Sequence, residues 1–262
     1  MKCANAVIYL SRHDGRQTRF HSYLYPMLWA ASNSFANVRD LSAHGDYRSV
    51  YVVARGVVEG CVNILYLMVS GDDVLEQAVQ HALQRTYRRQ NYEHAIGSSR
   101  VQVQRVGKDG EPPQLPQVVL DAIAEFSTKQ GREIREWTAA PLTSRMETIG
   151  EVLGDRVLQS LHIAYDAVYR DSSEIIHGTL FGALFAMGWT EPRGNWSHDE
   201  ANAFVNGHLF FVLMAVAAAF RETIAECARD LGNDRLAEIC RAVGSQHLEA
   251  LGRILDTREG NG

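Results

Sequence analysis

Apolar residues recur every three to four positions along most of this chain, and alternating apolar and polar runs are few. A spacing near 3.6 residues predicts amphipathic helices, whereas alternation predicts strands. Only six prolines interrupt the 262 residues. The pattern therefore predicts an all-α helical bundle of about seven to eight helices, over residues 18–39, 46–69, 73–94, 116–130, 145–153, 155–185, 197–231 and 234–255.

Turn signals set the boundaries of these helices. Ser70 to Asp73 ends one helix and caps the next, and Ser197 to Glu200 has the form of a capping box, in which serine and glutamate satisfy free amides reciprocally. Residues 101–106 alternate weakly, and a glycine- and proline-rich turn follows. We therefore expect a small hairpin or a loop excursion near residues 98–115.

The length is compatible with a single domain over residues 1–262. Within it we expect N-terminal helices over 18–95, the loop or hairpin excursion over 96–115, and C-terminal helices over 116–255. The most apolar run, residues 209–220, is too short to span a bilayer and predicts a buried core helix. The apolar stretch at the N-terminus is too short for a signal peptide. The sequence thus predicts no membrane contact.

The composition of the chain predicts its cellular compartment. The net charge is −5, and the apolar and charged fractions are those of an ordinary soluble protein. The four cysteines have no metal-ligand or redox spacing, which fits a reducing cytosol and predicts a cytoplasmic protein without a metal or other cofactor.

The main candidate for chemistry is the segment from Arg170 to His177. Seven helical steps place these two side chains on one face, with Glu174 between them. Histidine can transfer a proton near neutral pH, and arginine presents a planar cation suited to phosphate. RNA cleavage by its own 2′-hydroxyl needs a proton acceptor and a cation near the phosphate, and no metal.

A structural interpretation of the same stripe stays open. Asp166 precedes Arg170 by four residues, which is the favourable order for a helical ion pair. Glu174 can neutralise Arg170 instead of leaving it for a phosphate. The stripe is then an ion-pair ladder, and His177 is an ordinary helix histidine.

A second polar stripe, made of Arg55, Glu59 and Asn63, runs along an otherwise apolar helix. Buried charges must be paired, so one interpretation is a network that specifies the core. The other is that the stripe lines the same pocket as Arg170.

Residues 85–108 form the third candidate, because they hold six basic residues against one acidic residue. Arg85, Arg88 and Arg89 alternate with tyrosines there, a composition typical of tracks for single-stranded nucleic acid. A solvated helix face has the same composition.

The Arg55–Tyr66 and Tyr169–Gly178 segments together resemble a bacterial family of uncharacterised helical proteins, which share an Arg…Glu…Asn helix and a later Ser…His-Gly helix. That family is similar to the HEPN superfamily (higher eukaryotes and prokaryotes nucleotide-binding), whose helical bundles often carry Arg-x(4–6)-His. The resemblance covers residues 50–70 and 160–180.

The resemblance implies a metal-independent endoribonuclease, with a toxin or antiphage defence role. Arg170 then stabilises phosphate charge, His177 acts as general base or acid, and Asp171 and Glu174 orient them. It also implies a homodimer that brings two motifs together, and a cognate antitoxin or regulatory protein. The alternative is a catalytically inactive protein of the same fold that binds a nucleotide or a partner, or serves as a scaffold.

Overall fold

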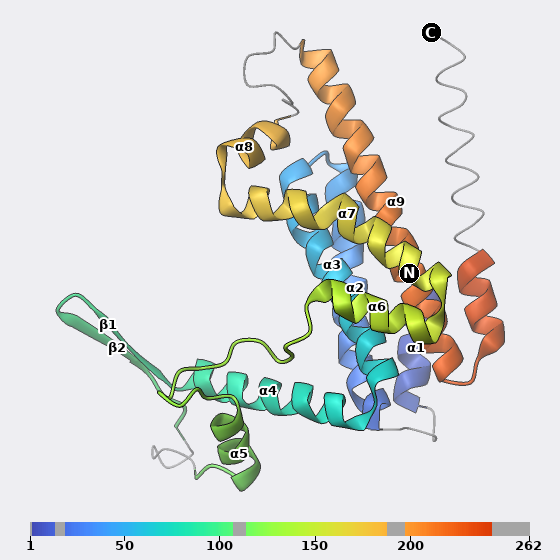
Figure 1. Ribbon diagram of the computed structural model, residues 1–262. Helices are drawn as coiled ribbons and strands as arrows, with labels where there is room; N and C mark the ends of the chain where they lie inside the picture. Colours follow the sequence, from blue (N-terminus) through green and yellow to red (C-terminus); the bar gives the residue numbers. More distant parts are fainter. Residues whose placement is uncertain (1, 14–18, 107–113, 188–196, 243–262) are drawn as a thin grey trace. The chain divides into compact units, whose positions relative to one another are not determined.

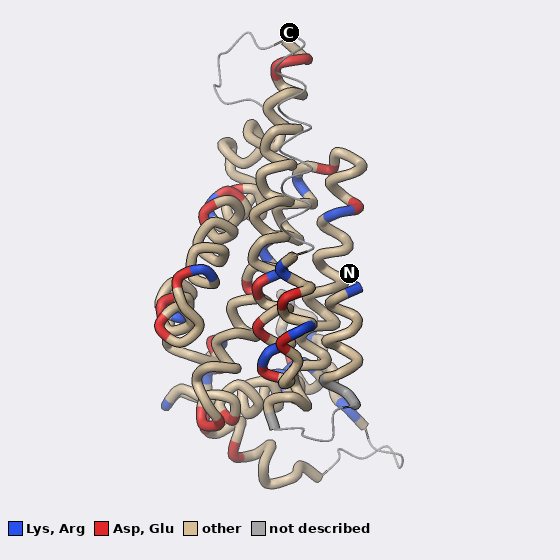
Figure 2. Tube along the Cα trace, turned by 90° about the vertical axis from the view of Figure 1, so that its right-hand side faces the viewer, with Lys and Arg blue, Asp and Glu red and all other residues tan. Residues whose placement is uncertain are grey.

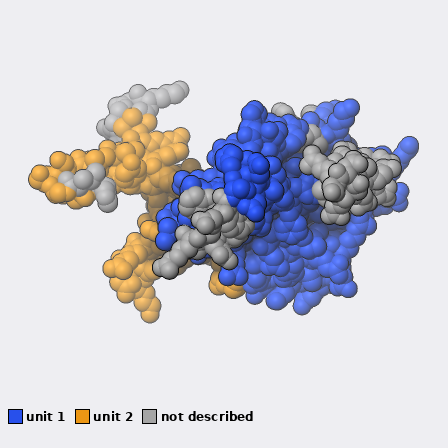
Figure 3. Space-filling view, turned by 90° about the horizontal axis from the view of Figure 1, so that it is seen from above, with its two compact units in different colours: residues 1–69, 142–262 blue, residues 70–141 orange. Residues whose placement is uncertain are grey.

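The chain folds mainly into α-helices, as the sequence predicts. The computed structural model describes residues 2–13, 19–106, 114–187 and 197–242 (Figure 1). These residues divide into two compact units, residues 1–69 with 142–262 and residues 70–141, which Figure 3 colours separately. The prediction of a single domain stays a prediction.

The first unit is a bundle of long helices. Its elements are α1 (Lys2–His13), α2 (Arg19–Ala43), α3 (Tyr47–Ser70), α6 (Leu142–Leu153), α7 (Asp155–His177), α8 (Leu180–Ala186), α9 (His198–Asp230) and a helical stretch over residues 234–242. α7 packs against α6, α8 and α9, and α2 packs against α1 and α9. The candidate motif therefore lies on a helix with neighbours along much of its length.

The core of this unit is centred on α3. Val57, Cys61 and Ile64 on this helix have no exposed surface. Leu161 of α7 and Val216 of α9 are buried to the same extent, so three helices contribute to one apolar interior. Burial of such side chains is worth about 1.5–3 kcal/mol each and is the main stabilising contribution to the bundle.

α3 and α9 are long and apolar enough to cross a membrane by length and composition alone. Both are partly buried inside the protein, and core helices of soluble proteins have the same composition. The predicted cytoplasmic location therefore stays a prediction.

The second unit holds α4 (Asp72–Gln90), a hairpin of β1 (Tyr92–Ile96) and β2 (Ser99–Val103), and α5 (Gln117–Glu125). The two strands pair in antiparallel register from Tyr92 opposite Val103 to Ile96 opposite Ser99. Gly97, with φ 60°, opens the two-residue turn between them. The hairpin begins before the predicted excursion at 98–115, because α4 ends at Gln90 and residues 92–94, predicted as the end of that helix, lie in β1.

Other boundaries differ from the sequence pattern as well. α1 precedes the first predicted helix; its buried Ala4 and Val7 lie on one face, and α1 packs against α2. α5 is shorter than predicted, and Gly131 (φ 76°) lies in the loop that follows it. The prediction of one helix over 155–185 is wrong, because α7 ends at His177 and α8 begins at Leu180. The predicted helix over 234–255 is present to residue 242, and its remainder lies outside the described residues.

Candidate functional site

α7 presents Arg170 and His177 to solvent. Both residues are exposed, and His177 is the last residue of the helix. Gly178 follows in the left-handed conformation (φ 63°), which glycine adopts without steric cost and which ends the helix. Seven residues of helix place the two Cα atoms about 10.5 Å apart along the axis.

Neither side chain of the pair forms an ion pair within the described part of the chain. Among residues 2–13, 19–106, 114–187 and 197–242 no ion pair joins Arg170 to Asp166 or Glu174. The Glu174 carboxylate instead accepts a hydrogen bond of 2.8 Å from the hydroxyl of Thr179, the residue that caps α8. The ion-pair ladder that the spacing allows is therefore not formed.

Thr179 fixes the corner between α7 and α8. Its hydroxyl oxygen also accepts a hydrogen bond of 3.0 Å from the amide of Gly182. A Cβ atom on Gly182 would lie 2.4 Å from the carbonyl oxygen of Glu174, so the two helices meet backbone to backbone. The corner holds Glu174 in place, three residues before His177.

Asp171 lies beside the pair on a partly buried flank of α7. Burial raises the pKa of its carboxyl, and Glu174 adds to the effect, while His208 of α9 and Arg170 act in the opposite direction. His208 shows the reverse behaviour, since burial lowers its pKa and Asp171 partly offsets this. Asp171 is thus coupled electrostatically to Arg170, and also to α9.

A cluster of aromatic rings adjoins Asp171. Phe185 of α8 contacts Tyr47 and Tyr51 of α3, and Phe204 and His208 of α9, at ring-centroid distances of 5.4–5.8 Å. Burial raises the pKa of Tyr51 to about 12, the charge of Asp171 adds to the rise, and a hydrogen bond with Tyr47 opposes it. The hydroxyl of Tyr47 is buried and has no well-formed hydrogen bond among the described residues, although Tyr51 is close enough to affect its pKa.

The second polar stripe contacts α7 one residue before Arg170. Arg55 donates a hydrogen bond of 3.0 Å from Nε to Glu59 and another of 3.0 Å from Nη2 to the hydroxyl of Tyr169. Its guanidinium also lies over the Tyr169 ring, 4.2 Å from the centroid. Burial alone would lower the pKa of Arg55, but Glu59 and Tyr169 outweigh it and raise the pKa.

Asn63, the third member of the stripe, faces a different helix. Its side-chain oxygen accepts a short hydrogen bond from Arg145 of α6. The stripe therefore connects α3 with α7 through Arg55 and with α6 through Asn63. Arg55 and Glu59 lie near the Arg170 motif, whereas Asn63 has no hydrogen bond to α7 among the described residues.

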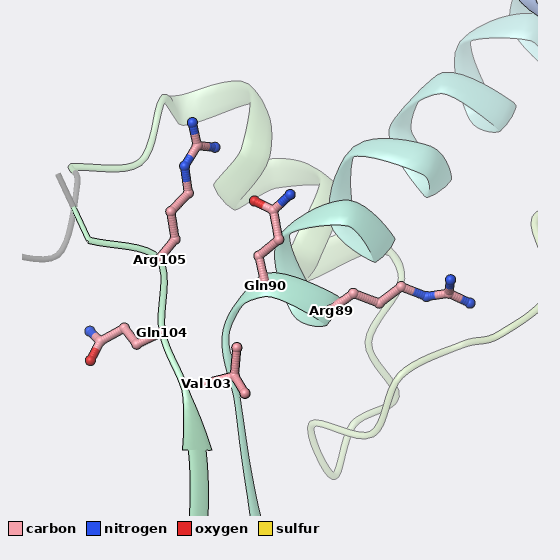
Figure 4. Close-up of a pocket in the computed structure, with 5 residues that line it drawn as sticks. All are labelled: Arg89, Gln90, Val103, Gln104 and Arg105. Carbon is pink, nitrogen blue, oxygen red and sulfur yellow. The ribbon is translucent and has the colours of Figure 1, made fainter.

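The basic residues of the second unit have different environments. Arg88 donates to Gln84 and Ser127, at 2.8 and 2.6 Å, and Arg85 donates to the carbonyl of Arg135 at 3.3 Å. Arg89 is exposed and lines an open pocket with Arg105 (Figure 4). Of the three arginines singled out by composition, only Arg89 therefore lines this pocket.

Several residues of these networks were missed by sequence reasoning. They are Tyr47, Arg145, Tyr169, Thr179 and His208. Tyr165 and Tyr169 stack at 4.8 Å, and their spacing of four is a signal that the sequence does carry. Arg145 and His208 give no such signal, because their partners lie far away in the chain. Within the described residues, no three His, Cys, Asp or Glu side chains are grouped as metal ligands.

Comparison with known proteins places the chain in one family. Residues 21–194 match the family of unknown function DUF5677, and the chain belongs to that family. The match covers both Arg55 and the α7 motif and ends before α9. No curated protein matches the chain. No solved structure matches it either. The similarity to HEPN proteins stays a prediction.

Proposed function

We propose that this protein is a metal-independent endoribonuclease with Arg170 and His177 at its active site. The observation that carries the proposal is that both side chains are exposed on one face of α7, without an ion-pair partner among the described residues. Their neighbours Tyr169 and Glu174, by contrast, are held by Arg55 and Thr179. Two exposed functional side chains whose neighbours are held by hydrogen bonds are typical of a preorganised binding site.

The chemistry follows from the two groups. His177 takes the proton of a ribose 2′-hydroxyl, and the 2′-oxygen attacks the adjacent phosphorus. The bond from phosphorus to the 5′-oxygen breaks, and that oxygen leaves with a proton from water. Arg170 stabilises the negative charge that builds up on the phosphate oxygens. The products are a 2′,3′-cyclic phosphate and a free 5′-hydroxyl.

The other residues have supporting roles in this proposal. Asp171 orients Arg170 through its charge, and Glu174 holds the corner that ends α7 beside His177. Arg55 and Glu59 position Tyr169, and through it the helical turn that carries Arg170. In this proposal a homodimer brings two such sites together, and the nuclease acts as a toxin or defence effector.

The test is incubation of the purified protein with total RNA in the presence of EDTA. Cleavage that yields 2′,3′-cyclic phosphate ends is expected, and His177→Ala should lower its rate by about 10²–10⁴-fold. Arg170→Ala should lower the rate by about 10²–10³-fold, because it removes the charge stabilisation.

His162→Ala, on the same helix, is the matched control and should leave the rate unchanged. Thermal unfolding of each variant verifies that the fold is retained. If the folded wild-type protein cleaves no RNA, the alternative of a catalytically inactive binding or scaffold protein replaces this proposal.

A further inference from the structure

An open pocket of about 540 Å³ lies where α4 ends and the hairpin exits, entirely within the unit of residues 70–141. Its lining residues are two arginines, two glutamines and one valine: Arg89, Arg105, Gln90, Gln104 and Val103 (Figure 4). No carboxylate is among these residues. Among the described residues, the lining therefore offers hydrogen-bond donors and positive charge and no negative group.

Asn91 builds this pocket from two distant parts of the unit. Its side-chain nitrogen donates to the carbonyl of Tyr87 at 3.0 Å, and its side-chain oxygen accepts from the amide of Arg105 at 3.1 Å. The end of the hairpin is thereby fixed to the last turn of α4. An isolated two-stranded hairpin is only marginally stable, so this anchor keeps Arg105 close to Arg89.

The structure separates the arginines of this stretch into two groups. Arg88 and Arg100 make contacts inside the unit, to Ser127 at 2.6 Å and to Glu93 at 2.7 Å. Arg89 and Arg105, by contrast, have no side-chain hydrogen bond or ion pair among the described residues. Their charges are free to neutralise an external anion.

The directions of the side chains indicate whether the pocket suits a small or an extended anion. In Figure 4 the side chains of Arg105 and Gln90 extend to the same side, while Arg89 extends along another direction. Donors that diverge cannot enclose one small phosphate, but they can contact separate phosphates of an extended chain. Val103 adds an apolar surface between them.

We infer that this pocket binds the sugar–phosphate backbone of single-stranded RNA through Arg89 and Arg105. The choice of RNA rests on the proposed function, whereas the preference for an extended polyanion rests on the pocket itself. Binding through phosphates is independent of base sequence and weakens with salt, because each neutralised phosphate releases a counterion.

The experiment measures fluorescence anisotropy of a labelled single-stranded oligoribonucleotide with the full chain. His177→Ala is present in every protein so that the RNA stays intact. The pocket variant is Arg89→Ala with Arg105→Ala, and the matched control is Arg100→Ala with Arg132→Ala. Both variants remove two arginines from the same unit, and the controls are exposed residues outside the pocket.

The pocket variant is expected to weaken binding by about tenfold or more at low salt. It should also reduce the slope of log K against log salt by about 1.4, the value for two phosphate contacts on a single strand. The control should change the affinity less than twofold. Circular dichroism of each variant verifies that the helices are retained.

Equal losses in the two variants would mean that only net charge matters, and unchanged binding in the pocket variant would mean that the pocket is not used. Either result overturns the inference. Inorganic phosphate or a mononucleotide could also displace the RNA by more than its ionic strength explains. If that displacement requires Arg89 and Arg105, the pocket binds a small anion and the inference of an extended ligand is wrong. If binding depends on the pocket but the wild-type protein cleaves no RNA, only the proposed function is refuted. If the wild-type protein cleaves RNA but the pocket and control variants lose equal affinity, only this inference is refuted.

Discussion

The Asp171 carboxyl lies on a flank of α7 where burial opposes its ionisation. Because its pKa in the folded protein is raised above 3.8, the folded state binds the proton more tightly than the unfolded chain does. The ionised group therefore lowers stability above the folded pKa, and this cost disappears below about pH 4. The Asp171 charge near Arg170 is retained at a cost to the fold, which is typical of groups that serve a site.

Replacing Asp171 with asparagine should therefore raise the melting temperature at pH 7. The gain should shrink as the pH is lowered towards 4, since the wild-type carboxyl then becomes neutral as well. Thermal unfolding monitored by circular dichroism between pH 4 and pH 7 measures this. Asp166→Asn, at an exposed position of the same helix, is the control. A gain that is constant with pH would show that burial of the charge is not the cause.

At the scale of elements, the corner between α7 and α8 is the feature that the sequence pattern did not predict. Apolar periodicity continues through Phe185, so it gives no signal that the helix ends. The end depends on the left-handed Gly178 and on Thr179 as the cap of a new helix. A Gly-Thr pair inside a periodic run is compatible with a helix end, but the sequence alone does not show that the helix ends there. The packing of α8 on α7 decides between a break and a continuous helix.

Gly182→Ala is expected to destabilise this corner by about 1–3 kcal/mol, because its Cβ would overlap the backbone of Glu174. Gly207→Ala in α9 is the control, since nothing lies within 4 Å of a Cβ there. That change should stabilise the helix by up to about 1 kcal/mol. Chemical denaturation compares the two free energies of unfolding. Equal effects would mean that the corner is more adaptable than its geometry indicates.

Helix positions and the members of the polar stripes could be predicted from the chain alone, because periodicity and capping are local. α3 lies within one residue of its predicted bounds, and the Ser197 capping box is confirmed. Pairing between stripes could not be predicted. Arg55 binds Tyr169 across 114 residues, and no local pattern specifies which helix faces α3. The spacing alone leaves open whether Glu174 neutralises Arg170 or orients the pair, and in the structure the Glu174 carboxylate accepts a hydrogen bond from Thr179.

At the scale of the whole molecule, acidic and basic residues lie next to one another on several helices (Figure 2). The clearest case is Glu222 of α9, which has no exposed surface. It accepts hydrogen bonds from Arg156 at the start of α7, from its neighbour Arg221, and from Arg241 in the stretch 234–242. One buried carboxylate thus connects three helical segments.

Glu222→Gln is expected to lower the stability of the bundle by about 3 kcal/mol, because it removes the buried counter-charge of Arg156 and Arg221 and one of the two that pair with Arg241. For a protein of this size the melting temperature should fall by roughly 6–12 °C. The exposed Glu238→Gln serves as the control and should have little effect. A loss no larger than that of the control would show that water replaces the carboxylate without cost.

The unit of residues 70–141 interrupts the bundle between α3 and α6, and this has a consequence for synthesis on the ribosome. The contact between Arg55 and Tyr169 joins residues 114 positions apart. At 5–20 residues per second, α3 emerges roughly 6–23 s before its partner turn on α7 exists. During that interval the apolar surface of α3 is exposed to water unless α2 or a chaperone covers it.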